Sequence, residues 1–363
     1  MIPLLNFYFI KGDKMKKIIT GILSLALVLN LTGCGKSSSK NATVASKELV
    51  VVDWGGVYTD VSKKARYEPF EKKYNVTIKV VSPTDYGKFK AMAQSGNIEW
   101  DVVNVDADFA IRGAKNNLFE KLDYNVIKTD GVDKKFITEY GICSETFDVA
   151  ISYNTNNFNA INHPKTWSDV WDTKKFPGAR SFQKYALGTL EAALLADGVK
   201  PDKLYPLDVD RAFASLDKIK PSIKSWWTSG AQAPQILATG EVSTAAAWNG
   251  RVLAAKKQGS PVNVEYNQAV IFADAWVVAK GSKNKDLAMK FINYCTMAET
   301  QAEFSKLVDY GPTNSKALPL LSEEIKTRLG KSTNSAQQIV ADIKWWADNY
   351  EFVDKRFQNW LLK

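Results

Sequence analysis

The feature that most constrains the fold is a regular alternation of short apolar segments with helical segments that begins at Glu48. Apolar runs over 48–54, 75–82 and 101–105 are separated by helix-like stretches over 57–74 and 85–96. This βαβαβ order predicts a parallel sheet with helices on its faces. Ligands bind beyond the carboxyl ends of the strands in such sheets, so the loops at Trp54 and at 106–109 are expected to face a crevice.

The middle of the sequence predicts a second lobe. A strand-like run over 146–155 leads out of the first lobe and another over 273–281 leads back, and the segment between them has its own helical and strand patterns. The expected fold class is therefore α/β, with two lobes joined by a hinge of two crossing strands that can close on a small molecule. The predicted boundaries are 48–148 with 275–330 for lobe 1, 149–274 for lobe 2, and 331–363 for C-terminal helices that pack across the lobes.

The N-terminal region is typical of an export signal. A basic segment at 15–17 precedes an apolar run that is too short for a comfortable membrane span, and small residues stand just before Cys34. The order Leu31-Thr32-Gly33-Cys34 resembles a bacterial lipobox. That resemblance implies a lipoprotein signal peptide over 1–33 with Met15 as the true start, lipidation of Cys34, a flexible tether over 34–47, and anchoring to the outer face of the cytoplasmic membrane. The alternative is an uncleaved anchor helix.

Charge and residue counts exclude several classes of protein. Removing residues 1–33 takes away four lysines and one aspartate, which lowers the formal charge from +9 to +6, and basic residues are scattered among acids. Nucleic-acid binding is therefore not expected. After Cys34 the only cysteines are Cys143 and Cys295, and the sole histidine, His163, is expected in an exposed loop. A disulfide between the two cysteines and two buried thiols are both open, and neither a catalytic triad with histidine nor a metal site or other cofactor is expected.

Three longer runs and one short motif make the sequence similar to a known family. They are PKTWSDVWDTKKFPGAR (164–180), WWTSGAQAPQILATGEVSTAAAWNGR (226–251), FADAWVVAKGSKNKDLAMKFINY (272–294) and YGPTN (310–314). Residues 48–363 resemble the extracellular solute-binding proteins of ABC importers, in the branch for spermidine, putrescine and γ-aminobutyrate-like solutes. The resemblance implies the two-lobed periplasmic-binding-protein-like type II fold, a monomer, a membrane permease as partner, and a small amine or zwitterion as ligand.

Three residues are the leading candidates for binding that ligand. Trp54 ends the first strand, where its indole face would attract an ammonium group by about 0.5–2 kcal/mol; the alternative is a core tryptophan. Asp274 is a carboxylate in an otherwise apolar strand, where burial without a partner is costly. The resemblance implies that such an acid grips the amine, and the alternative is a structural ion pair.

Arg251 offers a planar fork for a carboxylate or a phosphonate. Together with Asp274 it would suit a zwitterion with separated charges, unless the two residues simply neutralise each other. Further binding candidates are Asp106, Asp108, Trp227, Trp248, Trp276 and Tyr310. Glu145 and Asp148 could add negative potential for an amine.

Three functions compete at this stage. The first is capture of a small amine-bearing solute, such as a polyamine or an ω-amino acid, and its delivery to a permease without catalysis. The second is an exported hydrolase that uses Asp106 and Asp108 as acid and base, although no nucleophile motif accompanies them. The third is an adhesin or sensor lipoprotein that presents a ligand, whose fold could be identical.

Overall fold

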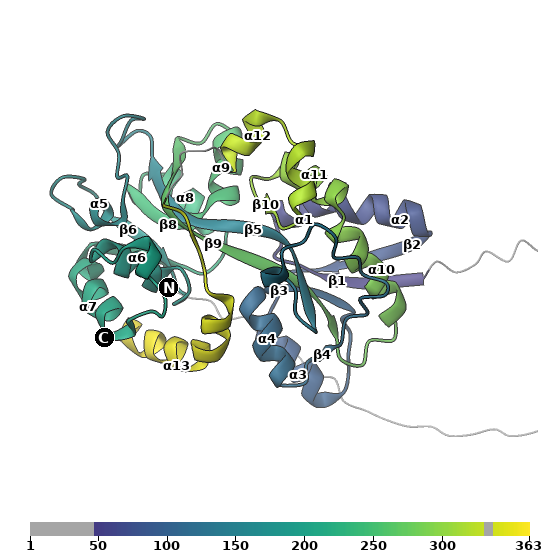
Figure 1. Cartoon of the computed structure of the whole chain (residues 1–363). Helices are drawn as coiled ribbons and strands as arrows, with labels where there is room; N and C mark the ends of the chain where they lie inside the picture. The colour runs from purple at the N-terminus through teal and green to yellow at the C-terminus, as the bar shows by residue number, and fades with distance from the viewer. Residues whose placement is uncertain (1–46, 330–336) are drawn as a thin grey trace, which may run out of the picture. The chain divides into compact units, whose positions relative to one another are not determined.

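A single hydrogen-bonded sheet runs through the part of the protein that the computed structural model describes, residues 47–329 and 337–363. The predicted signal peptide over 1–33, Cys34, nearly all of the tether over 34–47, and residues 331–336 lie outside the described residues. The main strand order is β2-β1-β3-β9-β5-β8-β6-β7, and β4, β10 and β11 add short pairings to β9 and β5. The sheet is continuous because two long strands belong to both lobes (Figure 1).

Those two strands are β5 (Gly141–Asn154) and β9 (Val262–Ala279). They pair antiparallel over most of their length, and Glu145 lies opposite Asp274. At one end β9 pairs with β3, and at the other end β5 pairs with β8. The predicted crossing strands over 146–155 and 273–281 are therefore present, but both strands begin earlier than predicted and β9 is much longer.

The first lobe follows the predicted βαβαβ order. Its parallel strands are β1 (Lys47–Val52), β2 (Val76–Val81) and β3 (Val102–Asp106). The helices around them are α1 (Val57–Ser62), the π-helical turn η1 (Lys63–Tyr67), α2 (Glu68–Tyr74), α3 (Tyr86–Ser95), α4 (Ala107–Lys115) and α10 (Lys285–Thr296), with β4 (Phe119–Glu120) and η2 (Lys134–Phe136) at the edge. Helix α3 begins where the Asp85 carboxylate accepts from the amide of Lys88 (2.9 Å) and ends at Gly96 in the left-handed region.

The second lobe holds the segment between the crossing strands. Its elements are α5 (Trp167–Trp171), β6 (Arg180–Gln183), α6 (Thr189–Ala196), η3 (Pro201–Lys203), α7 (Val209–Ile219), η4 (Lys220–Ser222), β7 (Ile223–Trp227), α8 (Gln232–Ala238), β8 (Thr244–Trp248) and α9 (Asn249–Lys257). After α10 the chain forms α11 (Ala298–Leu307), β10 (Gly311–Pro312), η5 (Ser315–Leu320), α12 (Glu323–Arg328), β11 (Ile339–Val340) and α13 (Ile343–Leu361).

Two large hydrophobic cores support the lobes. One is built from residues 49–143 and 273–295, and the other mainly from residues 147–272 and 304–360. The second core includes Tyr58 of α1, so the first helix already contacts it. The exact lobe boundaries given by the sequence stay a prediction.

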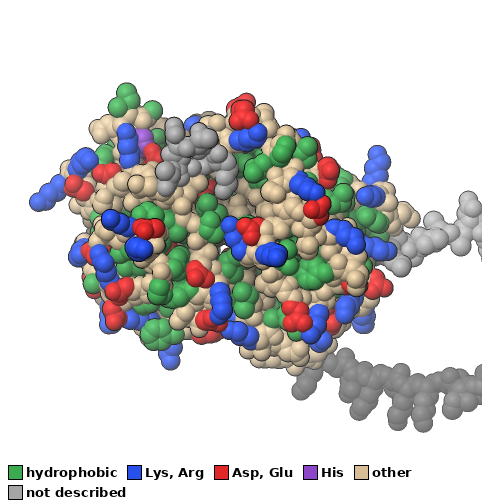
Figure 2. Space-filling view, in the orientation of Figure 1, with side chains coloured by type: hydrophobic (Ala, Val, Ile, Leu, Met, Phe, Trp, Pro, Cys, Tyr) green, Lys and Arg blue, Asp and Glu red, His purple; other side chains and the backbone are tan. Residues whose placement is uncertain are grey.

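Helix α13 lies along the second lobe and extends toward α4 of the first lobe (Figure 1). Trp346, Val353 and Phe357 are buried in the second core. On the other side Asp348 forms an ion pair with Lys115 of α4 (2.7 Å). Across the described residues, no helix combines the length and the apolarity needed to cross a membrane. Figure 2 shows basic and acidic side chains intermixed over one face of the protein.

Candidate functional site

A cavity of about 270 Å³ lies between the two lobes, which is near the lower end of the range of small-molecule pockets, about 300–1,000 Å³. We call it the interlobe cavity. Its wall is mainly aromatic, and the loops after β1, β2 and β3 contribute to it as expected for carboxyl-terminal strand ends. The rings are those of Trp54, Tyr58, Tyr86, Phe147, Tyr185, Trp248, Tyr310 and Tyr350. Such a wall suits a compact ligand with a cationic group.

Hydrogen bonds to Asp53 stabilise the turn that contains Trp54. The Asp53 carboxylate accepts from the amide of Gly55 (3.0 Å) and from the hydroxyl of Tyr67 (2.8 Å). Gly55 and Gly56 both have positive φ, which favours glycine. The indole of Trp54 then meets the ring of Tyr86 edge to face, with centroids 6.3 Å apart.

Asp274 lies in the interlobe cavity at the centre of the sheet. Its side chain is buried, and Oδ1 has no hydrogen-bond partner among the described residues. Burial, followed by the nearby Asp106 and Glu145, raises the pKa of Asp274 well above its usual value. Trp54 and Arg66 lower this pKa by smaller amounts. A buried carboxylate oxygen without a hydrogen-bond partner is costly, so this group is placed to receive a cation or a proton.

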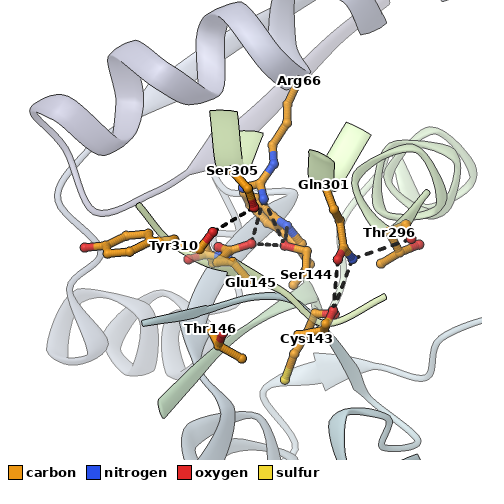
Figure 3. Close-up of polar contacts among 12 residues, drawn as sticks. Arg66, Cys143, Ser144, Glu145, Thr146, Thr296, Gln301, Ser305 and Tyr310 are labelled. Atoms are coloured by element: carbon orange, nitrogen blue, oxygen red, sulfur yellow. Dashed lines mark hydrogen bonds and ion pairs between the residues drawn. The ribbon is translucent and has the colours of Figure 1, made fainter. Parts of the chain in front are cut away.

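The neighbouring Glu145 is already neutralised. Figure 3 shows Arg66 extending toward Glu145 and Ser144, and the guanidinium contacts the Glu145 carboxylate at 2.7 Å. The hydroxyls of Tyr58 and Ser144 also donate to Glu145. Arg66 stacks over the ring of Phe304, 3.6 Å from its centroid. The buried Arg66–Glu145 pair therefore leaves Asp274 without a dedicated counter-charge.

Arg251 provides the positive group of the cavity. It lies in the first turn of α9, and its Nη2 donates to the carbonyl of Gly55 at 3.0 Å. Its Nε is buried and has no partner among the described residues. Within that part of the chain, no ion pair joins Arg251 to Asp274, although both line the same cavity. The two residues therefore do not neutralise each other.

Gly230 makes room for the Arg251 side chain. A Cβ at position 230 would lie 2.7 Å from the ring of Trp248 and 3.0 Å from the Nε of Arg251. Real Cβ atoms essentially never approach closer than 3.0 Å, so a side chain here would displace the indole and crowd the guanidinium. The WTSG segment at 227–230 thus shapes this end of the cavity.

The structure brings six of the nine predicted binding residues to the cavity wall. These are Trp54, Asp106, Trp248, Arg251, Asp274 and Tyr310. Tyr310 is positioned by Gly250, where a Cβ would lie 2.4 Å from the phenol ring. Their role in binding stays a proposal.

The other three predicted residues do not line the interlobe cavity. Asp108 is turned away by the first turn of α4 and pairs with Arg112 at 2.8 Å. Trp227 is buried behind Trp248, with ring centroids 5.0 Å apart, and its Nε1 donates to a backbone carbonyl. Trp276 is fully buried, and its indole N–H donates to Ser144 (2.8 Å). All three support the cavity from outside its wall.

Two further expectations can be compared with the structure. His163 is not exposed: it stacks on Tyr153, and its Nε2 lies 2.9 Å from a Glu265 carboxylate oxygen. The loop packs against β5 and β9 through these contacts, which a local sequence pattern does not reveal. Cys143 and Cys295 are both free and buried.

Several cavity residues were missed by sequence reasoning. Tyr86 follows the loop after β2, so the strand-end rule that selected Trp54 could have found it. Gln183 is the last residue of β6, and Tyr185 follows that strand in the same way. Tyr350 comes from α13, and no local signal connects that helix with the cavity.

Comparison with known proteins gives the family. A model of the bacterial extracellular solute-binding proteins matches residues 65–333, which is well over half of the chain. The chain belongs to this family. Its two-lobed α/β fold is that of a solute-binding protein, and the hydrolase and adhesin hypotheses have no support from the comparisons.

Relatives of this solute-binding protein have related ligands in their names. A "Gamma-aminobutyric acid-binding protein" of Pseudomonas aeruginosa is 35% identical over 340 residues, which cover 91% of this chain and 95% of the relative. The "Spermidine/putrescine-binding periplasmic protein 1" of Haemophilus influenzae is 26% identical and covers 86% of this chain and 89% of its own.

Solved structures show the same fold. A structure described as "Atu4243-GABA receptor" matches with a TM-score of 0.78 and 41% identity, covering 86% of this chain and 97% of that chain. An ABC transporter substrate-binding protein from Bradyrhizobium japonicum matches with a TM-score of 0.82 and 37% identity, covering 87% and 99%.

Proposed function

We propose that this solute-binding protein captures a small ω-amino acid such as γ-aminobutyrate and delivers it to an ABC permease. The observation that carries the proposal is the pair of opposite charges, Asp274 and Arg251, which line one aromatic cavity without forming an ion pair with each other. Asp274 would hold the ammonium group and Arg251 the carboxylate. The names of the relatives at 35% and 41% identity agree with this solute class.

The arrangement favours a zwitterion over a polyamine. A diamine would place its second ammonium near the Arg251 guanidinium, where like charges repel in a site shielded from water. A γ-aminobutyrate-sized molecule instead meets an opposite charge at each end. Closure of the lobes then surrounds both charges with the rings of Trp54 and Trp248, which excludes water.

The wider role follows from the family and from the N-terminal sequence. We propose that the protein is exported, anchored by lipid on Cys34 to the outer face of the cytoplasmic membrane, and monomeric. It would bind its solute without catalysis and release it to the permease. Membership of the solute-binding family supports export and the transport partner.

Ligand-dependent stabilisation tests the proposed solute. The mature domain is titrated with γ-aminobutyrate, putrescine and spermidine while thermal unfolding is followed. A ligand at a hundredfold excess over its Kd adds about 2.7 kcal/mol to the free energy of unfolding, which raises the unfolding midpoint by several degrees. γ-Aminobutyrate should give this rise and putrescine should give less. A rise with putrescine alone would replace the ω-amino acid by a polyamine.

A further inference from the structure

Two carboxylates face each other at one end of the interlobe cavity. Asp106 is the last residue of β3, and the antiparallel register places it directly opposite Asp274 of β9. Cβ atoms of directly opposed residues lie about 4.5–5.5 Å apart, and like charges at such positions repel. Both side chains line the cavity. They are on neighbouring strands of one sheet, so opening of the lobes does not separate them.

The guanidinium groups around this pair are engaged with other partners. Each makes a close polar contact that leaves the two carboxylates uncompensated. The contacts are Arg66 with Glu145 (2.7 Å), Arg112 with Asp108 (2.8 Å), and Arg251 with the carbonyl of Gly55 (3.0 Å). Arg112 and Arg66 favour the charged forms of Asp106 and Asp274 respectively, but among the described residues no ion pair joins either carboxylate to a cation.

The phenols and the thiol around the pair stay protonated near neutral pH. The hydroxyl of Tyr86 donates to Asp106 at 2.6 Å and accepts from its backbone amide at 2.9 Å. Burial raises the pKa of this phenol, of the other phenols at the cavity and of the nearby thiol. These other groups are Tyr58, Tyr185, Tyr310, Tyr350 and Cys143. Proton exchange near neutral pH is thus confined to carboxyl groups.

We propose that Asp106 and Asp274 together hold one proton in the empty cavity, and that the ammonium group of the bound solute replaces it. This inference rests on the proposed function, because it specifies how the ammonium end of an ω-amino acid is recognised. Asp106 thereby becomes a binding and specificity residue in addition to Asp274. No bond to carbon changes: the ammonium enters with its charge, and the shared proton leaves for the solvent.

The electrostatics of the two carboxyls agree with this geometry. Burial and then the neighbouring Asp108 raise the pKa of Asp106 to about 6, while Arg112 and the Tyr86 hydroxyl lower it. Two adjacent carboxylates that cannot both ionise share a proton. The exchange leaves the net charge of this end of the cavity unchanged. It also discriminates against a neutral hydroxyl in place of the amine, because a hydroxyl cannot replace the positive charge.

Proton release on binding is the direct test. Calorimetry with γ-aminobutyrate in two buffers of different ionisation enthalpy, at about pH 6, gives the number of protons released. We expect between about one half and one proton per ligand, and an affinity that weakens toward tenfold per pH unit below the pKa of the pair. Asp106→Asn should release fewer protons, and its affinity should vary less between pH 5 and 7, because loss of the opposing carboxylate lowers the pKa of Asp274 and the Asn amide donates an N–H in place of the shared proton.

Asp202→Asn is the matched control, because Asp202 is an exposed aspartate in η3. It should release the same number of protons as the unmodified protein. Release of no protons between about pH 5 and 8 by the unmodified protein would overturn the proposal, as would undiminished release by Asp106→Asn.

Infrared spectroscopy tests, without a ligand, whether Asp106 and Asp274 hold a proton. The ligand-free protein at about pH 5.5, below the pKa of Asp106, should show the carbonyl stretch of a protonated carboxyl that Asp274→Asn lacks and that Asp106→Asn shifts or weakens, because burial still raises the pKa of Asp274 when its opposing carboxylate is gone. Thermal unfolding confirms that each variant is folded. Burial also raises the pKa of Asp53, Asp108 and Glu191, so each variant is compared with the unmodified protein by difference spectrum. A protonated-carboxyl stretch that neither substitution changes places the proton on another acid and refutes the shared site. If γ-aminobutyrate gives no heat at all, the proposed solute fails, while this spectrum still tests the pair.

Discussion

Replacing Arg251 by alanine separates the solute classes most clearly. The guanidinium has two roles in the structure: it lines the cavity with an unpartnered Nε, and it donates to the carbonyl of Gly55 across the cavity. Loss of the Gly55 contact weakens closure around any ligand by about 1 kcal/mol, the usual net value of one hydrogen bond. Loss of a buried charged partner costs about 2–5 kcal/mol for a ligand whose carboxylate it held.

The two costs predict a difference between ligands. Arg251→Ala should weaken γ-aminobutyrate by about 100-fold to about 20,000-fold, because the two costs together are about 3–6 kcal/mol and each 1.4 kcal/mol is tenfold in Kd. Putrescine has no carboxylate, so it loses only the closure contact and gains relief from repulsion. Calorimetry of both ligands on the variant gives the comparison, and Arg211→Ala on the exposed side of α7 serves as the control. Equal weakening of both ligands would show that Arg251 has only a structural role.

Four further outcomes are expected. Gly230→Ala should weaken γ-aminobutyrate about tenfold by displacing the Trp248 indole, measured by calorimetry. Glu145→Gln should lower the free energy of unfolding in urea by about 3–5 kcal/mol, since it leaves a buried guanidinium unpaired, whereas the exposed Glu241→Gln should change it by less than about 0.5 kcal/mol. Burial raises the folded-state pKa of Asp106 to about 6. The contribution of Asp106 to the free energy of unfolding is therefore present at lower pH and is lost as the pH rises through about 6. The thermal unfolding midpoint of the ligand-free protein should fall as the pH rises to about 6, and it should fall less in Asp106→Asn. Cys34→Ala should leave the domain folded but move it out of the membrane fraction, because acyl chains provide the affinity; an unprocessed, equally membrane-bound variant would indicate a spanning helix.

The secondary structure of the first lobe could be predicted because its signals are local. Valine-rich runs, the Asp85 cap and the left-handed Gly96 place β1, β2 and α3 within a few residues of the prediction. The stretch over 57–74 was predicted as one helix, but a π-helical turn interrupts it at 63–67. The same turn carries Arg66, which is buried against Glu145. Sequence periodicity does not reveal such a change of helical pitch.

The binding residues were harder to predict because depth along a strand is a tertiary property. Trp276 lies on the same face of β9 as Asp274, but two residues along a strand is about 7 Å. At that distance the indole packs against Phe291 of α10 and no longer reaches the cavity. Tyr350 shows the converse: α13 is amphipathic in sequence, yet only the fold places one of its rings in the cavity wall.

The distribution of charge in the cavity explains why closure should depend on the solute. The acidic groups, Asp106 and Asp274, lie where β3 pairs with β9, whereas Arg251 comes from the first turn of α9, which follows β8 in the second lobe. Within the described residues Arg251 forms no ion pair and donates to the neutral carbonyl of Gly55, and no ion pair joins Asp106 or Asp274 to a cation. A zwitterion of the right length meets an opposite charge on both sides at once, so it favours the closed state by interactions that neither lobe makes alone. Because each lobe binds one end of the ligand, the bound ligand stabilises the closed arrangement of the lobes. A solute with a single charged end contacts only one of the two charged sites and stabilises the closed state less.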